Sequence, residues 1–394
     1  ERDGFTTKMV GNLAGHIEFA PNPDYKETLG VLGHVDVVPV GTGWETDPFE
    51  PQIINERIYA RGSSDDKGPS MAAYYALKII KELGLPVSKR VRFIIGTDEE
   101  SGWKCMDRYF QTEEMPDFGF SPDAEFPIIN GEKGILSLHF ELAAGESTGE
   151  YRLKNFHSGL RENMVPQDAK AEVVVPNSSE FVAAFDAYIA ANPVEGTASV
   201  NEGVVVLDVV GKSAHGSTPQ AGINAATYLA GFLNQYDFAG QAKNFLSFAA
   251  DVLHLDTDGA KLNVAFEDSV MGPLTANAGI LTFAPEVGGK LVVNFRYPRG
   301  IDAKTVETKA NGVSSNYGLT VSAGKSQVPH YVSPEDPLVA TLLDVYAKQT
   351  GLPAHEQSIG GGTYGRIFER GVAYGALFPD SIDTMHQANE FFAL

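Results

Sequence analysis

The chain has 394 residues, more than one hydrophobic core usually serves, so two domains are the default expectation. A hydrophobic content of 43% with 21% charged residues is typical of a globular protein and gives no indication of disorder. The formal net charge of −21 argues against partners that require clustered Lys and Arg, namely nucleic acids and anionic membranes.

The cysteine content and the hydropathy indicate the cellular compartment in which we expect the protein. Cys105 is the only cysteine, so no internal disulfide can form and a reducing compartment is favoured. No apolar run approaches the roughly 18 to 20 residues that span a bilayer, and no basic-then-apolar leader opens the sequence. We therefore expect a soluble, cytoplasmic protein without a membrane partner.

The first hundred residues alternate between strand and helix patterns. Strands are predicted over residues 16–19, 28–32 and 90–95, and a helix over 70–83, where apolar side chains recur at helical spacing until Gly84. This alternation indicates a layered α/β domain, in which ligands collect on loops beyond the carboxyl ends of strands.

From about residue 134 the pattern changes to α+β. The strands expected there are 134–142, 171–175, 203–210, 279–283 and 290–295, and the helices are 179–191, 223–236 and 303–311. Near residue 328 the α/β pattern resumes, with a predicted helix over 337–350 and a strand over 372–377. We expect an α/β domain with a mixed sheet, formed by residues 1–133 and 328–394, interrupted by a large α+β domain over residues 134–327.

His34 follows the predicted strand at 28–32, and Asp36 comes two residues later. A metal-bound histidine almost always donates its second ring N–H to a carboxylate or carbonyl group, so His34 is a candidate ligand and Asp36 a candidate partner that orients its ring. Alone, a His-x-Asp pattern more often serves a core hydrogen bond or a loop cap.

Four further stretches place a carboxylate or imidazole beside Gly or Pro, at or past a strand end or before a helix. They are residues 61–69, 96–102, 121–125 and 385–390. Their ordinary alternatives are, in that order, a helix N-cap cluster, a solvated acidic loop, a turn and a surface histidine.

Taken together, these stretches supply a possible dinuclear metal site. Such a site needs one carboxylate that bridges two metal ions about 3.5 to 4 Å apart and two further ligands for each ion. The candidates reach that number: His34, Asp65, Glu100, Asp123 and His386. This mixture suits two Zn²⁺ ions per chain, with Mn²⁺ or Co²⁺ as alternatives.

Several of these motifs carry a family resemblance. They are His-Val-Asp-Val-Val-Pro from residue 34, Gly-Ser-Ser-Asp-Asp-Lys-Gly from residue 62, Asp-Glu-Glu-Ser from residue 98, Ser-Pro-Asp-Ala-Glu from residue 121 and the late Met385-His386. The chain resembles the zinc-dependent metallopeptidase family that includes acetylornithine deacetylase, aminoacylase, carnosinase and the bacterial dipeptidases of PepV type. The PepV type is most similar, through residues 123–134 and 359–366, and the likeness covers nearly the whole chain.

The resemblance implies a two-domain metallopeptidase whose inserted domain is a lid. It implies that His34 and Asp123 complete the ligands of one metal, that Glu100 and His386 complete those of the other, and that Asp65 bridges both. The Asp65–Asp66 peptide bond would be cis. A water bridging the two metal ions would attack the scissile carbonyl, and Glu99, as general base, would move its proton to the leaving amine. Members of the family also have one helical segment before the region that corresponds to this chain and another after it.

The inserted domain would supply substrate contacts. By the same resemblance, His215 in the glycine-rich stretch 211–219 helps to bind the oxyanion, while Asn163 and Arg296 hold the substrate, Arg296 by its carboxylate. In the α/β domain, Gly361 and Gly362 begin a predicted helix whose N–H groups would help to enclose that carboxylate. The alternatives are a core histidine, a turn asparagine, a surface arginine and an ordinary glycine loop.

Dimeric members of the family lend a lid histidine across the subunit interface. The insertion in this chain, about 190 residues, is longer than the modal domain of ~100 to 150 residues. A doubled lid could supply His215 from the same chain, as in the PepV type, so we expect a catalytically complete monomer.

The function that the resemblance implies is two-metal hydrolysis of dipeptides that have a free N-terminus. Alternatives are an N-acyl amino acid deacylase of the same family, of the acetylornithine deacetylase or succinyl-diaminopimelate desuccinylase type, and a metal-dependent binding protein without catalysis. Cys105 has no nearby histidine in the sequence and is expected to serve packing. His330 lies near the expected domain junction.

Overall fold

The computed structural model describes residues 1–394, apart from the side chain of Lys325. It consists of two compact units, which we call unit 1 (Glu1–Glu132 with His330–Leu394) and unit 2 (Lys133–Pro329). The boundaries expected from the sequence, after residues 133 and 327, lie one and two residues from these. Each unit is described by itself.

Unit 1 is built on a six-stranded mixed sheet. In spatial order its strands are β1 (Thr6–Val10), β2 (Ala14–Phe19), β6 (Arg90–Gly96), β3 (Thr28–His34), β7 (Phe118–Ser121) and β22 (Gly371–Ala373). β3 runs parallel to both of its neighbours, β6 and β7. Because β3 is interior, its carboxyl end brings His34 to the centre of one sheet edge.

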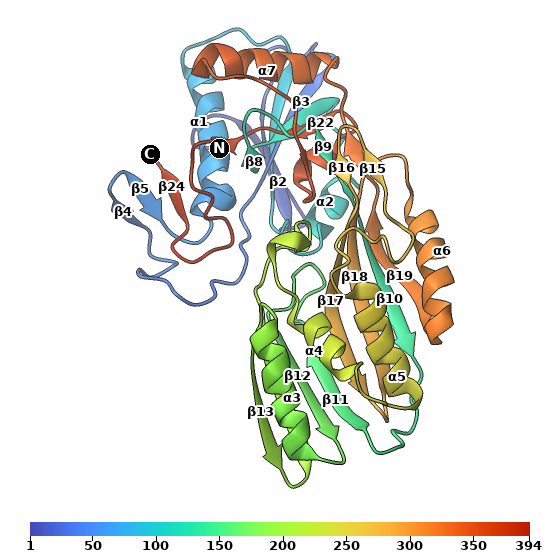
Figure 1. The fold of residues 1–394 in the computed structure, drawn as a ribbon. Helices are drawn as coiled ribbons and strands as arrows, with labels where there is room; N and C mark the ends of the chain where they lie inside the picture. The colour runs from blue at the N-terminus through green and yellow to red at the C-terminus, as the bar shows by residue number, and fades with distance from the viewer. The chain divides into compact units, whose positions relative to one another are not determined.

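Helices cover both faces of this sheet. They are α1 (Gly68–Glu82), α2 (Lys104–Tyr109) and α7 (Pro337–Thr350). Leu29 of β3 packs in the cluster that includes α7, and Gly33, on the same face, meets Ser70 of α1. Leu32 points to the opposite face and packs with α2. Figure 1 shows α1 and α7 outside the strands of unit 1.

Local signals account for the ends of these helices. The Asp336 side chain accepts a hydrogen bond from the Leu338 N–H at the start of α7, and Gly351, with φ of 72°, follows its last residue. Pro69 occupies the first turn of α1, where a missing N–H costs little.

Three small sheets attach loops to this framework. The strands are β4 (Gln52–Ile54), β5 (Arg57–Tyr59) and β24 (Phe391–Ala393) in one sheet, β9 (Gly131–Glu132), β20 (His330–Tyr331) and β21 (Ser358–Ile359) in another, and β8 (Ala124–Glu125) with β23 (Ala376–Leu377) in the third. The strand expected over residues 372–377 is wrong, because β22 and β23 belong to different sheets and are separated at Tyr374 and Gly375.

Unit 2 contains one eight-stranded antiparallel sheet. Its spatial order is β13 (Glu195–Asn201), β14 (Val204–Val210), β12 (Asp168–Val174), β11 (Arg152–Ser158), β17 (Thr275–Ala284), β18 (Gly288–Tyr297), β10 (Gly134–Leu142) and β19 (Thr320–Gln327). Side chains along β14 alternate between buried and more exposed positions, which is the pattern of a sheet covered on one face.

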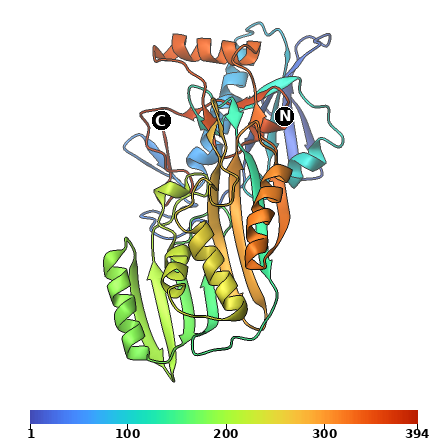
Figure 2. The same ribbon diagram turned by 45° about the vertical axis from the view of Figure 1, so that its right-hand side comes forward.

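The covered face carries four helices: α3 (Ser178–Ala191), α4 (Ala225–Leu233), α5 (Gly240–Ser247) and α6 (Ala303–Ser314). Their apolar side chains join one core cluster with the inward residues of the strands, including Phe185, Phe232 and Phe245. Figure 2 shows these helices alongside the strands. Among the helices that the structure describes, none is both long and apolar enough for a bilayer span.

Candidate metal centre

His34 ends strand β3 and is almost completely buried, at 1% exposure. Its ring Nδ1 lies 3.0 Å from the backbone carbonyl oxygen of Asp36 and 3.5 Å from the Asp36 carboxylate. The carbonyl is therefore the nearer partner of this nitrogen. A donor–acceptor contact at Nδ1 leaves Nε2 directed at the carboxylates on the other side.

The Asp36 carboxylate has a second task. It accepts hydrogen bonds from the backbone N–H groups of Glu99 and Glu100, each at 3.1 Å. Although burial favours its protonated form, His34 and these two N–H groups hold the pKa of Asp36 below its usual value. Asp36 thus fixes the turn after β6 relative to His34.

Asp65 lies between two imidazoles. Its Oδ1 is 3.0 Å from His34 Nε2, and its Oδ2 is 2.8 Å from His386 Nε2. The Asp65–Asp66 peptide bond is cis, as the resemblance implied. Burial alone would raise the pKa of Asp65, but the two histidines lower it below its usual range. One carboxylate thus offers a separate oxygen to each histidine.

Each histidine also has a second carboxylate beside it. Asp123 Oδ2 lies 3.5 Å from His34 Nε2, and Glu100 Oε1 lies 3.3 Å from His386 Nε2. Contacts with Asp65 and Glu100 raise the pKa of His386 to about 10, and burial raises that of Asp123 to about 6. All five residues proposed from the sequence as ligands therefore lie together in unit 1.

Asp66 was not among the expected functional residues. It is fully buried, and its Oδ2 accepts hydrogen bonds from the His34 N–H at 3.1 Å and from Ser70 Oγ at 2.8 Å. Burial and then the nearby Asp123 raise its pKa well above the usual value. The signal for it was its place in the Asp65-Asp66 pair. Asp66 holds the end of β3 against the start of α1.

Glu99 precedes Glu100 in the turn after β6. Its exposure is intermediate, but enough protein surrounds the carboxyl that burial, and then the charge of Asp123, raises its pKa well above the usual value. The Trp103 ring N–H donates to its backbone carbonyl at 2.7 Å. A carboxyl in such surroundings is suited to accept a proton and to give it up again.

The donor set fits divalent metal ions. Ligand atoms of His34, Asp65 and Glu100 lie within 4.8 Å of one another, and so do those of His34, Asp66 and Asp123. Within the described part of the chain, the buried Glu100 Oε1 makes no hydrogen bond beyond its 3.3 Å contact with His386 Nε2, and the buried Asp66 Oδ1 makes none. Imidazole and carboxylate groups are ligands that zinc accepts at about 2.0 to 2.2 Å. A cation held by the candidate ligand Glu100 would satisfy its buried oxygen.

The expected lid residues lie in unit 2. Met164, beside Asn163, pairs with His215 as an isolated β-bridge, and the Gly216 N–H donates to the Asn163 carbonyl at 2.7 Å. The His215 Nδ1 accepts a hydrogen bond from the Ser217 N–H at 3.2 Å. The structure therefore brings Asn163 and His215 into adjacent segments of this unit.

Two asparagines that the sequence did not single out support Asn163 and Arg296. Asn277 of β17 donates from its side-chain nitrogen to the carbonyls of Glu162 and Met164, each at 2.9 Å. Asn294 of β18 accepts from the Nε of the buried Arg296 at 3.0 Å. The contacts of Asn277 span more than 110 residues of sequence, so no local pattern marked it, whereas Asn294 lies only two residues before Arg296.

Gly361 and Gly362 lie in unit 1 after β21. The helix predicted to begin there is wrong, because the segment that follows is a four-residue 3₁₀ turn, Tyr364–Ile367. Thr363 donates to Glu132 from its hydroxyl at 2.8 Å and from its N–H at 3.2 Å. The glycines thus belong to a loop that the buried Glu132 anchors.

Known proteins are similar to this chain in sequence. Residues 30–394 match the family described as peptidase family M20/M25/M40. The chain belongs to this family. A protein of Staphylococcus saprophyticus, named provisionally as a dipeptidase, is 46% identical over 99% of this chain and 84% of its own length. A protein of Staphylococcus aureus strain MRSA252 with the same provisional name is also 46% identical, over 99% of this chain and 83% of its own length. This M20 chain is accordingly a peptidase.

Solved structures share the fold of this M20 peptidase. A tripeptidase from Staphylococcus aureus matches with a TM-score of 0.56 at 15% identity, covering 100% of this chain and 84% of its own. Aminoacylhistidine dipeptidase from Vibrio alginolyticus matches with a TM-score of 0.56 at 15% identity, covering 100% and 86%. Human carnosine dipeptidase 1 matches with a TM-score of 0.53 at 16% identity, covering 100% and 83%. At these identities the likeness concerns the fold.

Proposed function

We propose that this M20 peptidase hydrolyses dipeptides with a free N-terminus at a centre of two zinc ions. His34 and Asp123 would hold one ion and Glu100 and His386 the other, with Asp65 shared. The observation that carries the proposal is the position of Asp65, whose two carboxylate oxygens each contact a different histidine. The staphylococcal relatives with dipeptidase names support the substrate class.

The reaction assigns a task to each group. Two divalent cations, when bound, would lower the pKa of a water molecule and polarise the scissile carbonyl. Glu99 accepts the proton of the attacking water and transfers it to the leaving amine nitrogen, so that the peptide C–N bond breaks and an amine and a carboxylate are released. Asp36 positions Glu99 by accepting a hydrogen bond from the Glu99 backbone N–H.

Unit 2 would supply the groups that recognise the substrate. Because the Ser217 N–H can only donate, His215 Nδ1 is an acceptor, and the proton of the neutral ring lies on Nε2, which can donate to the oxyanion. Arg296 binds the substrate carboxylate and Asn163 its backbone. Gly361 and Gly362 of unit 1 allow close approach of that carboxylate.

The proposal includes a cytoplasmic monomer. Cys105 is buried with its sulfur 3.0 Å from the Tyr364 hydroxyl, which agrees with a packing role in a reducing compartment. Unit 2 forms one continuous sheet of eight strands from a single chain, which supports a doubled lid that supplies its own His215.

A substrate panel tests the function. Free dipeptides, the same dipeptides acetylated at the N-terminus, tripeptides and N-acyl amino acids are assayed with protein reconstituted separately with zinc, manganese and cobalt. We expect free dipeptides to be cleaved fastest, with two metal ions per chain by elemental analysis. Faster cleavage of N-acyl amino acids would favour a deacylase, and no hydrolysis by metal-replete protein would favour a binding protein.

A further inference from the structure

We propose that Glu390 and Arg61 are positioning residues that set the spacing between the metal ligands Asp65 and His386. Neither touches the reacting atoms. The inference rests on the proposed function only to the extent that the centre binds metal, and it adds two residues to those that the sequence motifs supplied.

The Glu390 carboxylate is completely buried and accepts five hydrogen bonds from one short segment of chain. Its Oε1 accepts from the N–H of Ser64 at 2.9 Å, from the N–H of Asp65 at 3.1 Å and from Ser64 Oγ at 3.3 Å. Its Oε2 accepts from Arg61 Nη1 at 2.7 Å and from the Gly62 N–H at 3.0 Å. A single side chain therefore fixes the backbone that carries Asp65.

The same two segments meet a second time at the metal centre. His386 lies four residues before Glu390, and its Nε2 is 2.8 Å from Asp65 Oδ2. The segment that carries His386 is irregular until β24 begins at Phe391, and the His386 side chain is 54% exposed. Packing around the imidazole therefore contributes little to its position. The Glu390 contacts, four residues away, join this segment to the one that carries Asp65.

Arg61 extends this arrangement to a third segment. Its Nη2 donates to the carbonyl of Val40 at 3.3 Å, and its guanidinium lies over the Trp44 ring at 5.2 Å from the centroid. The Trp44 ring N–H donates to the same Val40 carbonyl at 2.7 Å. Val40 follows Asp36 by four residues. Arg61 and Glu390 thus connect the segments that carry Asp36, Asp65 and His386.

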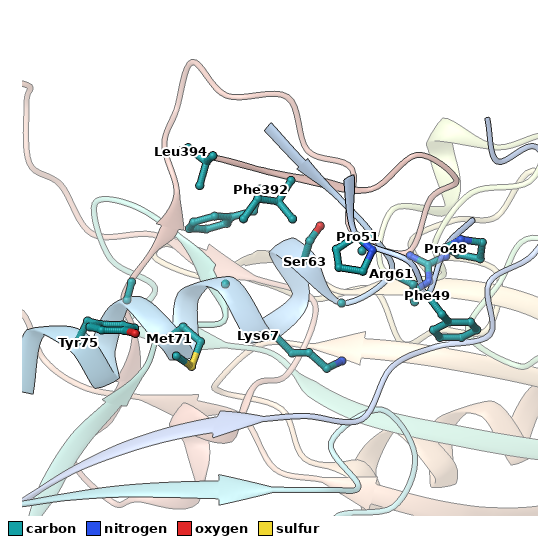
Figure 3. A pocket seen from close by; sticks show the side chains of 15 residues that line it. Pro48, Phe49, Pro51, Arg61, Ser63, Lys67, Met71, Tyr75, Phe392 and Leu394 are labelled. Atoms are coloured by element: carbon teal, nitrogen blue, oxygen red, sulfur yellow. The ribbon is translucent and has the colours of Figure 1, made fainter. Parts of the chain in front are cut away.

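The other side of the segment at Arg61 faces apolar surroundings. Arg61, Ser63 and Lys67 line a cavity of about 570 Å³ whose wall includes Met71 and Phe392 (Figure 3). Apolar side chains predominate there, and the N–H groups of Gly62, Ser64 and Asp65 have their acceptor in Glu390.

Stability alone does not account for such a pair. Arg61 and Glu390 are 5% and 0% exposed, and a buried ion pair is often no more stabilising than apolar residues of similar volume. The groups that this pair contacts are the backbone of a metal ligand and the segments beside two more. A role in holding the ligands explains its location.

Zinc binding by the full-length protein tests the inference. The affinity of wild type and Glu390→Gln is measured by competition with a chelator, without substrate. Gln keeps the size of the side chain but replaces one acceptor oxygen by an NH₂ group that faces Arg61 and Gly62. We expect zinc affinity to fall 10- to 100-fold, as when partners that orient ligands are lost, and the zinc-induced rise in Tm to become smaller.

Asp336→Asn is the matched control. Asp336 forms a two-bond ion pair with Arg370 at 2.8 and 2.9 Å in the same unit and caps α7, and none of its partners in the described part of the chain is a metal ligand. We expect it to lower the Tm of the zinc-free and zinc-bound forms equally and to leave zinc affinity within threefold of wild type.

Arg61→Lys keeps the positive charge and provides a second variant if Glu390→Gln does not fold. It should weaken zinc binding because a lysine ammonium cannot bridge Glu390 and Val40 as the guanidinium does. Wild-type zinc affinity in either folded variant would overturn the inference. The zinc affinities are measured without substrate. Failure of the wild type to cleave dipeptides would therefore contradict the proposed function but would not change the result on zinc binding.

Discussion

At the scale of single residues, negative charge dominates the candidate centre. Asp65, Glu100 and Asp123 lie against two histidines, and the raised pKa values of Asp123 and Glu99 show the cost of gathering carboxylates in a buried place. A bound cation would offset that cost, because its positive charge attracts the carboxylates that otherwise repel one another. The arrangement is therefore better suited to holding metal than to standing empty.

Replacing Glu99 by Gln tests its role as the base. The amide has nearly the same shape but cannot accept the proton, so we expect kcat for a dipeptide to fall ~10²- to 10⁴-fold while two metal ions per chain remain bound. The backbone contacts to Asp36 and Trp103 do not involve the side chain and are kept. Glu141→Gln, on an exposed position of β10, is the control. A kcat within tenfold of wild type would rule Glu99 out as base.

Glu132, which is not a proposed metal ligand, should make the free energy of unfolding depend on pH. Burial raises its pKa to about 7, although Arg366 and Thr363 act in the opposite direction. Its folded form therefore keeps a proton that the unfolded chain has lost, so its contribution favours folding at low pH and is lost as pH rises through about 7. We expect unfolding free energies, measured at pH 5 and pH 8, to show Glu132→Gln gaining on the order of 3 kcal/mol relative to wild type at the higher pH.

Both proteins in that comparison carry the same metal ligands, so any pH dependence of metal binding cancels in the difference. A difference between wild type and variant that stays constant from pH 5 to pH 8 would mean that Glu132 ionises normally in the folded protein.

At the scale of elements, the contact between β3 and α1 positions the centre. The His34 N–H and Ser70 Oγ both donate to Asp66, so the end of the strand and the start of the helix share one carboxylate. Gly33 allows this approach, because a Cβ there would lie 2.0 Å from Ser70 Oγ and 2.9 Å from Asp66 Oδ2. The strand can bring His34 to the centre only with glycine at this point.

Gly33→Ala is expected to force these elements apart. We expect zinc-free protein to lose roughly 1 to 3 kcal/mol of stability in urea unfolding, as for other overpacked sites, and zinc retained after gel filtration to drop well below two ions per chain. Gly312→Ala in α6 is the matched control, since a Cβ there meets nothing within 4 Å. Alanine should stabilise that helix by about 0.5 to 1 kcal/mol. Equal behaviour of the two variants would contradict the close approach.

At the scale of the whole molecule, the proposed metal ligands and the proposed substrate-binding residues belong mainly to different units. Unit 1 holds every candidate metal ligand, and unit 2 carries His215, Asn163 and Arg296 on or beside its eight-stranded sheet. The proposed reaction needs groups from both units. We expect both sets of groups to come from the same chain.

Mixing two inactive variants tests whether each chain supplies its own unit 2 residues. Glu99→Ala removes the proposed base and His215→Ala removes the proposed oxyanion donor, so each protein should be nearly inactive. If the unit 2 residues act on the centre of their own chain, we expect the mixture to show no more activity than the sum of its parts. Recovered activity approaching a quarter to a half of wild type would indicate that subunits share their sites.

Local patterns accounted for much of the fold. α7 occupies the predicted residues 337–350 because a capping aspartate, a run at helical spacing and a terminal glycine all lie within one segment. β10 likewise begins and ends where its apolar alternation predicted. β13, in contrast, went unpredicted, because an edge strand of mostly small and polar residues becomes a strand only by pairing with β14. The prediction that a helix begins at the glycines 360–362 was wrong, because only a four-residue 3₁₀ turn follows them.

Neighbours within a few positions of the chain were enough to predict the residue types of the candidate centre and their places in loops beside strands and helices. The tertiary structure alone decided that Asp65 faces His34 and His386 with different oxygens, and that Glu390 accepts the N–H groups of a segment more than 320 residues earlier. Such contacts depend on how strands pair and loops close across the whole chain. Local spacing carries no information about that closure.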